Sequence, residues 1–319
     1  MPNHTTTDLL SRRRLLLLAA GVSLAACQSK PLQPATPAVP AATSAPSAAA
    51  ASAPAPLPVP KRPPKLGLAL GGGAARGFAH IGVIQVLEEA GIRPDLVVGT
   101  SAGSLVAALY AHGKTGAELA NLALTMDEGT ITDWAFPGRG LIRGDALARY
   151  VREQTGGKPI EQMKLRLGIV ATDLDSGAGV LFERGDTGQA VRASSSVPAV
   201  FQPVKIGDRE YVDGGLVAPV PVRYARQMGA EMVLAVDISS PPDGAATDGT
   251  MRLLLQTFAI MGKSINRFEL LGADVVLRPA LVGVSSADFT SRVRAIRSGR
   301  EMAAAMLPEI KAKLAALAR

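Results

Sequence analysis

Three consecutive glycines at residues 71–73 lie between a five-residue apolar run, residues 66–70, and a segment with helical periodicity. In that segment large apolar residues recur at three-residue steps over residues 78–87, and Gly91 follows where a helix would end. A strand, a glycine loop and a helix in this order predict a βα unit whose loop amides converge at the positive N-terminus of the helix. Such a loop binds an anion, which is a dinucleotide pyrophosphate, a nucleotide phosphate or a reaction oxyanion.

The same alternation of strand and helix patterns continues along the chain. Further strands are predicted at residues 95–98, 165–171, 180–182, 231–238 and 274–277, and another ends at Asp213. Helices are predicted at residues 102–111 and 251–271 and over a terminal region, residues 289–314, that Pro308 is expected to bend. This alternation predicts an α/β, three-layer domain with a mostly parallel central sheet. No internal repeat or second linker divides residues 65–319, so they are predicted to be one domain.

The first 27 residues have the features of an export signal rather than of a fold. Three arginines at residues 12–14 precede an uncharged stretch of 12 residues, whereas a helix that crosses a bilayer needs about 20. The stretch ends at Cys27, the one cysteine of the chain, in a sequence that resembles the lipobox of bacterial lipoproteins. We therefore predict a signal peptide over residues 1–26 and a lipid anchor on Cys27. The alternative is a plain signal peptide with an incidental cysteine.

The lipobox resemblance implies an exported bacterial lipoprotein that is anchored in a membrane through Cys27. The next residue is Gln28, not the aspartate that tends to retain such proteins at the inner membrane. The outer membrane is therefore favoured, on its periplasmic or surface side. The three arginines leave the general secretory and the twin-arginine routes open.

Composition separates the segment after Cys27 from the domain. Residues 31–64 contain 11 prolines and 11 alanines, so residues 27–64 are predicted to be a disordered tether. Residues 65–319 carry 28 Lys or Arg residues against 26 Asp or Glu residues, although the whole chain has a net charge of +7. This near-neutral domain argues against nucleic acid as a partner. One cysteine and three histidines exclude a disulfide and a thiolate zinc site, and no metal or cofactor is predicted.

A second motif, Gly99-Thr100-Ser101-Ala102-Gly103, directly follows the predicted strand at residues 95–98 and opens the next helix. This is a G-x-S-x-G nucleophile elbow in the strand–turn–helix context that it requires. The glycine loop at residues 71–73 lacks the lysine of a phosphate loop, and the second strand lacks the acidic residue that binds a ribose. The two motifs together favour an oxyanion loop beside a nucleophilic serine over a nucleotide site.

An α/β-hydrolase supplies the base for its serine from a histidine later in the chain, and this order is impossible for Ser101. The chain has no histidine after His112, which lies on the helix that starts at the elbow, roughly 16 Å along its axis. His80 is expected to be a packing histidine on the helix after the glycine loop. Asp213, followed by Gly214 and Gly215, is the candidate, because a partly desolvated carboxylate can accept the serine proton. A lysine base and an ordinary Asp-Gly turn at this position remain as alternatives.

These three motifs together resemble the patatin-like phospholipase family, and in particular its bacterial branch related to neuropathy target esterase (NTE). The resemblance covers nearly all of residues 65–280, and it includes two further blocks at residues 171–174 and 192–198. It implies a Ser–Asp dyad, hydrolysis of lipid acyl esters and no metal. Membrane lipids are then both the substrate and the anchoring surface.

The resemblance also assigns roles to individual residues. Ser101 is the nucleophile and Asp213 activates it, and Arg76 either supports the glycine loop, contacts a lipid phosphate or forms a salt bridge at the helix start. Ala218 departs from the asparagine common in this branch, which puts the local hydrogen bonding of that loop in doubt. The oxyanion hole and the motif glycines are expected at Gly71, Gly72, Gly73, Ala74 and Arg76, and at Gly99, Gly103, Gly214 and Gly215.

The sequence also allows alternative interpretations of the function and of two segments. A catalytically silent lipoprotein that uses the patatin fold as a binding or scaffold module needs no reactive serine. The segment from Trp134 to Ile142, with Phe136, is either a lipid-facing flap or a packed loop. Residues 173–177 are similar to a calcium loop but lack its terminal glutamate, which favours a turn.

Overall fold

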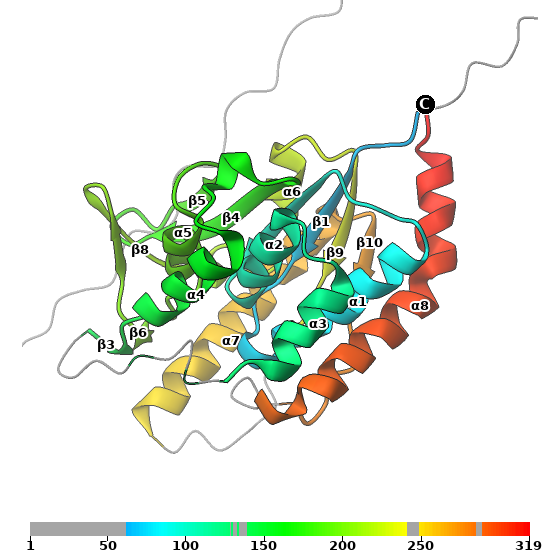
Figure 1. Ribbon diagram of the computed structural model, residues 1–319. Helices are drawn as coiled ribbons and strands as arrows, with labels where there is room; N and C mark the ends of the chain where they lie inside the picture. The colour runs from blue at the N-terminus through cyan, green and yellow to red at the C-terminus, as the bar shows by residue number, and fades with distance from the viewer. Residues whose placement is uncertain (1–61, 128, 130–132, 134–138, 241–248, 285–288) are drawn as a thin grey trace, which may run out of the picture. The chain divides into compact units, whose positions relative to one another are not determined.

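An eight-stranded sheet forms the centre of the domain in the computed structural model (Figure 1). The model describes residues 62–127, 129, 133, 139–240, 249–284 and 289–319. The expected signal peptide, Cys27, the expected tether, Trp134 and Phe136 lie outside the described residues. The strand order is β10-β9-β1-β2-β4-β8-β7, and β5 also pairs with β4. The strands are β1 (Leu66–Leu70), β2 (Leu96–Thr100), β4 (Arg166–Asp173), β5 (Gly179–Phe182), β7 (Val204–Ile206), β8 (Arg209–Asp213), β9 (Met232–Val236) and β10 (Val275–Leu277).

The sheet is mixed but mostly parallel along its main path. The pairs β10–β9, β9–β1, β1–β2 and β2–β4 are parallel, whereas β4–β5, β4–β8 and β7–β8 are antiparallel. A separate two-stranded sheet joins β3 (Gly140–Ile142) to β6 (Ala199–Phe201). The prediction of a mostly parallel α/β sheet is therefore confirmed, with an antiparallel extension at the β4 side.

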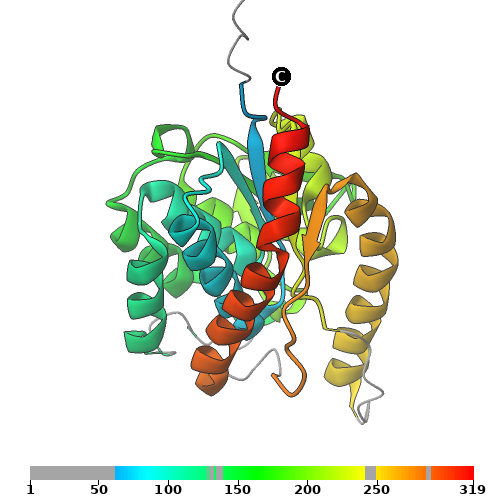
Figure 2. The same ribbon diagram turned by 90° about the vertical axis from the view of Figure 1, so that its right-hand side faces the viewer.

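Helices cover both faces of the sheet. Residues along each central strand alternate between two hydrophobic clusters, one on each face, and the helices pack on these clusters. Leu68 and Leu70 of β1 join one cluster, whereas Ala69 joins the other. Figure 2 shows α7 (gold) apart from α8 and the cyan-to-green helices. One face carries α1 (Phe78–Glu89), α2 (Ala102–His112), α3 (Gly116–Thr125), α4 (Asp145–Thr155), α5 (Thr187–Ser194) and α8 (Arg292–Ala316), and the other carries α6 (Val222–Gln227) and α7 (Thr250–Glu269).

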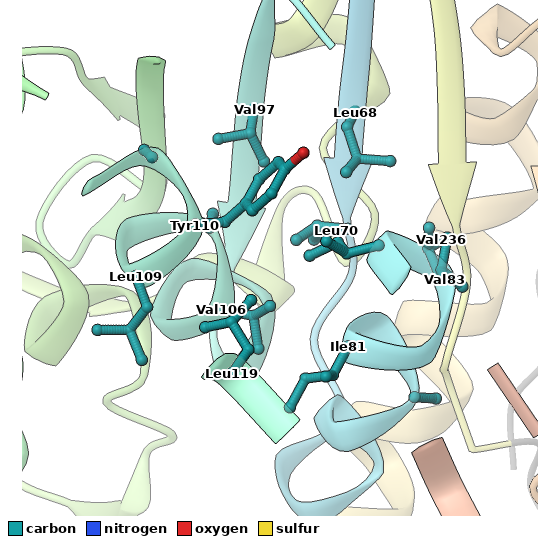
Figure 3. Close-up of a cluster of buried hydrophobic side chains, with 14 of the residues drawn as sticks. Leu68, Leu70, Ile81, Val83, Val97, Val106, Leu109, Tyr110, Leu119 and Val236 are labelled. Carbon is teal, nitrogen blue, oxygen red and sulfur yellow. The ribbon is translucent and has the colours of Figure 1, made fainter. Parts of the chain in front are cut away.

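The larger cluster fixes the glycine loop and the elbow on the same side of the sheet. Figure 3 shows Leu68 and Leu70 of β1 and Val97 of β2 beneath side chains of α1 and α2, including Ile81 and Val106. Each of these five side chains is buried, which contributes on the order of 1.5–3 kcal/mol per large side chain. The two βα units that carry the motifs are therefore held side by side by their own core.

The predicted elements agree with the structure to within a few residues. The strand at residues 231–238 is shorter, at Met232–Val236, and the helix at residues 251–271 runs as α7 and then a 3-10 turn. Helix α8 contains Pro308 and changes direction along its length in Figure 1. Short 3-10 segments are η1 (Ala74–Gly77), η3 (Ile160–Gln162), η4 (Gly214–Leu216), η5 (Leu270–Gly272) and η6 (Phe289–Ser291). Within the described ranges, no helix has both the length and the apolar content to cross a membrane.

Candidate active site

Ser101 occupies a strained turn between β2 and α2. Its backbone has φ 53° and ψ −125°, in a region that costs a non-glycine residue of order 1–3 kcal/mol. The flanking glycines are required by close packing, because a Cβ atom on Gly99 would overlap the carbonyl of Gly103, and one on Gly103 would overlap the carbonyl of Leu70. The predicted elbow is therefore present in the structure, with the strain that such an elbow stores.

Strand β4 brings the elbow and Asp213 together. Thr100, the last residue of β2, pairs with Val170, and Asp213, the last residue of β8, pairs with Ala171. Strand β5 occupies the opposite edge of β4 over residues 169–172, so β2 and β8 share one edge. Because β2 is parallel and β8 antiparallel to β4, the carboxyl ends of the two strands meet head to head. Ser101 and Asp213 therefore lie next to each other although the chain separates them widely.

The backbone around Asp213 fixes its carboxyl group. The backbone N–H of Asp213 donates to the Ser196 carbonyl at 2.9 Å, and the Thr172 hydroxyl donates to the Asp213 carbonyl at 2.8 Å. One carboxyl oxygen, Oδ1, accepts the N–H of Gly215 at 2.6 Å. Gly214 has no room for a side chain, because a Cβ atom there would overlap the carbonyl of Val170.

The second carboxyl oxygen of Asp213 is an open acceptor. Oδ2 is buried, and no described residue gives it a hydrogen bond of good geometry. Burial raises the pKa of Asp213 to about 6, and interactions with the Ser101 hydroxyl and the Gly215 N–H lower it. Oδ2 is thus the carboxyl oxygen that is available to a proton donor in the cavity. This arrangement suits a base, since a desolvated carboxylate has more affinity for the serine proton.

Of the five residues expected to form the oxyanion hole, two have an amide that is available. The Arg76 N–H donates to the Gly73 carbonyl at 3.1 Å within the loop itself. The Gly71 N–H donates to the Val236 carbonyl at 3.1 Å, and the Gly72 N–H donates to the Pro219 carbonyl at 2.9 Å. These two amides are used by the fold and are not available to an oxyanion. Those of Gly73 and Ala74 have no hydrogen-bond partner in the described part of the chain, and Ala74 has a positive φ of 49°. The candidate oxyanion donors are therefore Gly73 and Ala74.

Arg76 supports this loop from inside the protein. The side chain is 7% exposed, and its guanidinium donates to the Ser239 carbonyl at 2.9 Å and to the Ser240 hydroxyl. Burial lowers the pKa of Arg76, and nearby Asp237 opposes that shift. None of the salt bridges between described residues involves Arg76. Of the three roles considered for Arg76, support of the loop is the one that these contacts favour, and contact with a lipid phosphate stays a prediction.

His80 is a structural residue, as the sequence predicted. It is fully buried, and its Nε2 lies 2.8 Å from the Gly71 carbonyl. A carbonyl only accepts, so Nε2 carries the proton and Nδ1 is bare. Burial lowers the pKa of His80 to about 4, which keeps the ring neutral near pH 7. The ring therefore fastens the start of the glycine loop instead of acting on Ser101.

A cavity of about 390 Å³ opens at these groups. The described residues that line it include Gly73, Ala74, Ser101 and Asp213, together with an apolar wall. Among the described residues, three non-glycine residues have a positive φ. Two are Ala74 and Ser101, and the third, Ala199, lies between the lining residues Pro198 and Val200. Backbone strain gathers around this one cavity, which is typical of functional sites. The apolar wall comprises Val197, Pro198, Val200, Phe201, Leu216, Pro219, Leu255, Phe258 and Ala259.

Sequence reasoning missed Ser194 and Ser196, which hold the backbones of Ser101 and Asp213. The N–H of Ser101 donates to Ser194 Oγ at 2.9 Å, and that hydroxyl donates to the Val170 carbonyl at 2.6 Å. The carbonyl of Ser196 accepts the N–H of Asp213 at 2.9 Å. The signal was present in the block at residues 192–198, but a run of small polar residues does not reveal which atoms it will contact.

The loop around Ala218 is ordered by its backbone. The Ala218 carbonyl accepts the Thr100 hydroxyl at 2.9 Å, and its N–H donates to the Gly214 carbonyl at 2.9 Å. Asn266 of α7 supplies a buried amide nearby, whose Oδ1 accepts the N–H of Val220 at 3.2 Å. The departure at Ala218 therefore leaves this loop tied to both β2 and α7.

Residues 173–177 form a turn. Asp173 accepts the N–H and the hydroxyl of Ser176 at 2.9 and 2.8 Å, and its other oxygen accepts from Arg209 at 2.7 Å. These donors lower the pKa of Asp173 to about 2, with Arg209 as the largest cause. The carboxylate is thus fully engaged by the turn. Among the residues that the structure describes, no group of three or more His, Cys, Asp or Glu side chains is arranged to hold a metal ion.

Comparisons with known proteins agree with this geometry. The profile of the family described as patatin-like phospholipase matches residues 68–226, which include Ser101 and Asp213. An uncharacterized NTE family protein of Mycobacterium tuberculosis is 36% identical over 188 residues, which cover 58% of this chain and 52% of that protein. The human patatin-like phospholipase domain-containing protein 6 is 35% identical over 184 residues, 55% of this chain and 13% of that protein. The chain thus spans about half the length of the mycobacterial relative.

A solved structure shows the same fold. VipD from Legionella pneumophila superposes with a TM-score of 0.56 at 15% sequence identity, over 78% of this chain and 68% of that chain. At this identity the likeness extends to the arrangement of helices and strands alone.

Proposed function

We propose that this chain, whose residues 68–226 form a patatin-like phospholipase domain, hydrolyses acyl esters of membrane lipids with a Ser101–Asp213 dyad. The family implies lipid acyl hydrolase activity in general, and its members are usually serine hydrolases. The observation that carries the proposal is the meeting of β2 and β8 on one edge of β4, which sets a buried carboxyl beside a strained serine. Both groups line the cavity that also holds two amides without partners.

The reaction begins with the Ser101 hydroxyl. Its oxygen attacks the ester carbonyl carbon while its proton passes to the Asp213 carboxylate. The carbonyl oxygen becomes an oxyanion, which the N–H groups of Gly73 and Ala74 stabilise. When the tetrahedral intermediate collapses, the C–O bond to the alcohol breaks and Asp213 returns the proton to the leaving oxygen.

Water then completes the cycle. Asp213 accepts a proton from a water molecule, whose oxygen attacks the acyl-enzyme carbonyl, and the fatty acid leaves Ser101 with its proton restored. The apolar wall of the cavity, including Val200, Phe201 and Phe258, suits the acyl chain of a lipid better than a polar acyl group. No group in this sequence of steps requires a cofactor.

The sequence around Cys27 supports a proposed location at a membrane, where the lipid substrate is found. Cleavage before Cys27 and lipid modification of its thiol anchor the chain in a bacterial membrane, and Gln28 favours the outer membrane. The segment to residue 64 then acts as a spacer that raises the local concentration of the domain near lipid.

A labelling experiment and a product analysis test this function. A fluorophosphonate probe should label the wild-type chain and fail to label Ser101→Ala, because the probe reports an activated serine. The purified chain should release free fatty acid from phospholipid or lysophospholipid, as measured by mass spectrometry. A folded chain that neither labels nor releases fatty acid would instead be the silent binding lipoprotein.

A further inference from the structure

Helix α7 packs against the domain over a small part of its surface. It spans 20 residues, Thr250–Glu269, and Asn266 is its one fully buried residue. Figure 2 shows the helix (gold) standing at the side of the sheet, separate from the other long helices. A helix this long with so little buried area needs either a solvated polar surface or a partner.

The inner side of α7 belongs to the active-site cavity. Leu255, Phe258, Ala259, Gly262 and Lys263 line the cavity that holds Ser101. The Asn266 amide nitrogen, one turn further on, donates to the Ser239 hydroxyl at 2.9 Å. The helix is therefore fastened to the site at this end.

The outer side of α7 is apolar. Leu253, Ile260, Met261 and Phe268 are 55%, 51%, 45% and 74% exposed, and Leu271 in the following turn is 80% exposed. Leu253 and Ile260 are seven residues apart, as are Met261 and Phe268, so these side chains fall along one stripe of the helix. We call these five residues the outer stripe. The exposed Thr257 and Ser264 lie on the same side of the helix, between these large apolar side chains. An exposed surface dominated by large apolar side chains marks an interaction surface.

A basic flank runs beside the outer stripe. Lys263, at the edge of the cavity, and Arg267 lie at helical positions between the stripe and the cavity side, at 100° per residue. The one acidic residue of α7, Glu269, forms an ion pair with Arg223 of α6. An apolar stripe with a cationic flank matches a bilayer surface that carries anionic headgroups.

We propose that α7 is an interfacial helix that lies on an anionic lipid surface, with its outer stripe among the acyl chains and its basic flank at the headgroups. This inference rests on the proposed function, because it gives the lipid ester a route to the cavity from the bilayer. A second copy of the chain fits less well, since a symmetric contact through α7 would bring two cationic flanks together. An anionic lipid surface buries the outer stripe in its acyl chains and pairs its headgroups with the basic flank.

A single-site fluorescence experiment tests the docking separately from catalysis. The full chain carries one cysteine, so Cys27→Ser removes the thiol and Ile260→Cys introduces one on the outer stripe. Ser101→Ala in the same chain prevents hydrolysis. Leu124→Cys on α3 is the matched control, because Leu124 is 50% exposed and Ile260 is 51% exposed. An environment-sensitive dye at each position reports whether that side chain enters hydrocarbon.

The dye at position 260 should shift to the blue on vesicles of phosphatidylcholine with phosphatidylglycerol, more than on phosphatidylcholine alone. The dye at position 124 should not shift. An unchanged spectrum at position 260, or an equal shift at both positions, would overturn the proposal. A shift at position 260 that grows with protein concentration without vesicles would assign the stripe to a second copy and would also overturn it.

Activity measurements separate this inference from the proposed function. With Ser101 intact, Ile260→Asp with Phe268→Asp should lower vesicle hydrolysis by on the order of tenfold, because interfacial binding scales with buried apolar area. Hydrolysis of a short soluble ester should stay within about twofold, since neither residue lines the cavity. Equal losses on both substrates would contradict the docking role. A dye shift at position 260 in a chain whose wild type has no esterase activity would leave the docking intact and reject the hydrolase.

Discussion

Ser194 holds the backbone of Ser101: its hydroxyl oxygen accepts the Ser101 N–H at 2.9 Å and passes its own hydrogen to the Val170 carbonyl at 2.6 Å. Both ends of this bridge lie at the meeting point of β2 and β4. The bridge opposes relaxation of the positive φ at Ser101, because a rotated peptide would leave a buried N–H without its acceptor. Under the proposed function, Ser194 is therefore a positioning residue, whose effect on catalysis would pass through Ser101.

Ser194→Ala should lower kcat by about 10- to 100-fold with little change in KM, since it disturbs the placement of Ser101 and not the cavity wall. Unfolding free energy should fall by about 1–3 kcal/mol for the orphaned N–H and carbonyl. Ser195→Ala is the control, because no side-chain hydrogen bond of Ser195 is recorded in the structure. Equal kinetics for the two variants would reject the positioning role.

Ser101→Ala and Asp213→Asn should each reduce hydrolysis by several orders of magnitude, and the double variant should be no worse than either one. Residues that act as a unit are strongly non-additive in this way. Asp208→Asn, in the exposed turn before β8, and His80→Gln should keep most of the activity if the chain stays folded. The measurement is kcat/KM on one ester with folding checked by circular dichroism. Retained activity in Asp213→Asn would move the base to another residue, such as a lysine.

The pH profile should report Asp213. The base must be ionised, and burial raises its pKa to about 6, so kcat/KM should rise with pH through about 6 and fall below it. His80 does not contribute to this limb, because its pKa is lowered to about 4. A limb near pH 4 in a stably folded enzyme would show that Asp213 is not desolvated in solution.

Asp213→Asn should raise stability at pH 8. The pKa of Asp213 is higher in the folded protein than its ordinary value. The native state therefore binds more protons than the unfolded state between about pH 4 and 6. Stability is therefore lost as pH rises through that window, by up to about 3 kcal/mol, and the loss persists above it. Asparagine carries no charge, so the melting temperature of the variant should exceed that of the wild type at pH 8 and by less at pH 4.

Asp173→Asn is a control of opposite sign for that stability effect. The pKa of Asp173 is lowered to about 2 by Arg209 and Ser176, so its carboxylate stabilises the native state at neutral pH and loses that effect in acid. The substitution should lower the melting temperature at pH 8. A gain in both variants would show a general charge effect rather than desolvation at Asp213.

Mass spectrometry of the membrane-extracted chain should find its N-terminus at Cys27, with a diacylglyceryl group and an acyl group on that residue. Cys27→Ser should abolish the lipid mass, because serine offers no thiol for the modification. An unmodified Cys27, or a chain that begins elsewhere, would remove the anchor from the proposal and leave the domain's chemistry untouched.

The sequence predicted several elements that carry regular patterns, although helices α3, α4, α5 and α6 were not among the predicted helices. The strand at Leu66–Leu70, the buried helix at Ala102–His112 and the elbow at Ser101 follow from apolar runs and glycine spacing, which are local properties. The antiparallel extension of the sheet could not be predicted in this way, because β7 and β8 are short and half-polar. Their place beside β4 is decided by pairing between distant segments.

The hydrogen bonding of the glycine loop could not be predicted from the local sequence. Four consecutive amides at residues 71–74 look equivalent in the sequence, yet the carbonyls of Val236 and Pro219 engage the first two. Those acceptors come from segments more than 140 residues later in the chain. The bridge from Ser194 to Ser101 is equally non-local. The residue types predicted which side chains gather in the site. Backbone contacts between distant segments determine which amides are available to bind an oxyanion.

The head-to-head meeting of β2 and β8 has a consequence for incomplete chains. Ser101 lies early in the chain, whereas Asp213 comes beside it only when β8 pairs with β4. Because translation proceeds from the N-terminus, a nascent or truncated chain that ends before β8 contains Ser101 without the carboxylate proposed as its proton acceptor. Under the proposed function such a chain would not hydrolyse lipid esters, so activity would report that β8 has joined the sheet.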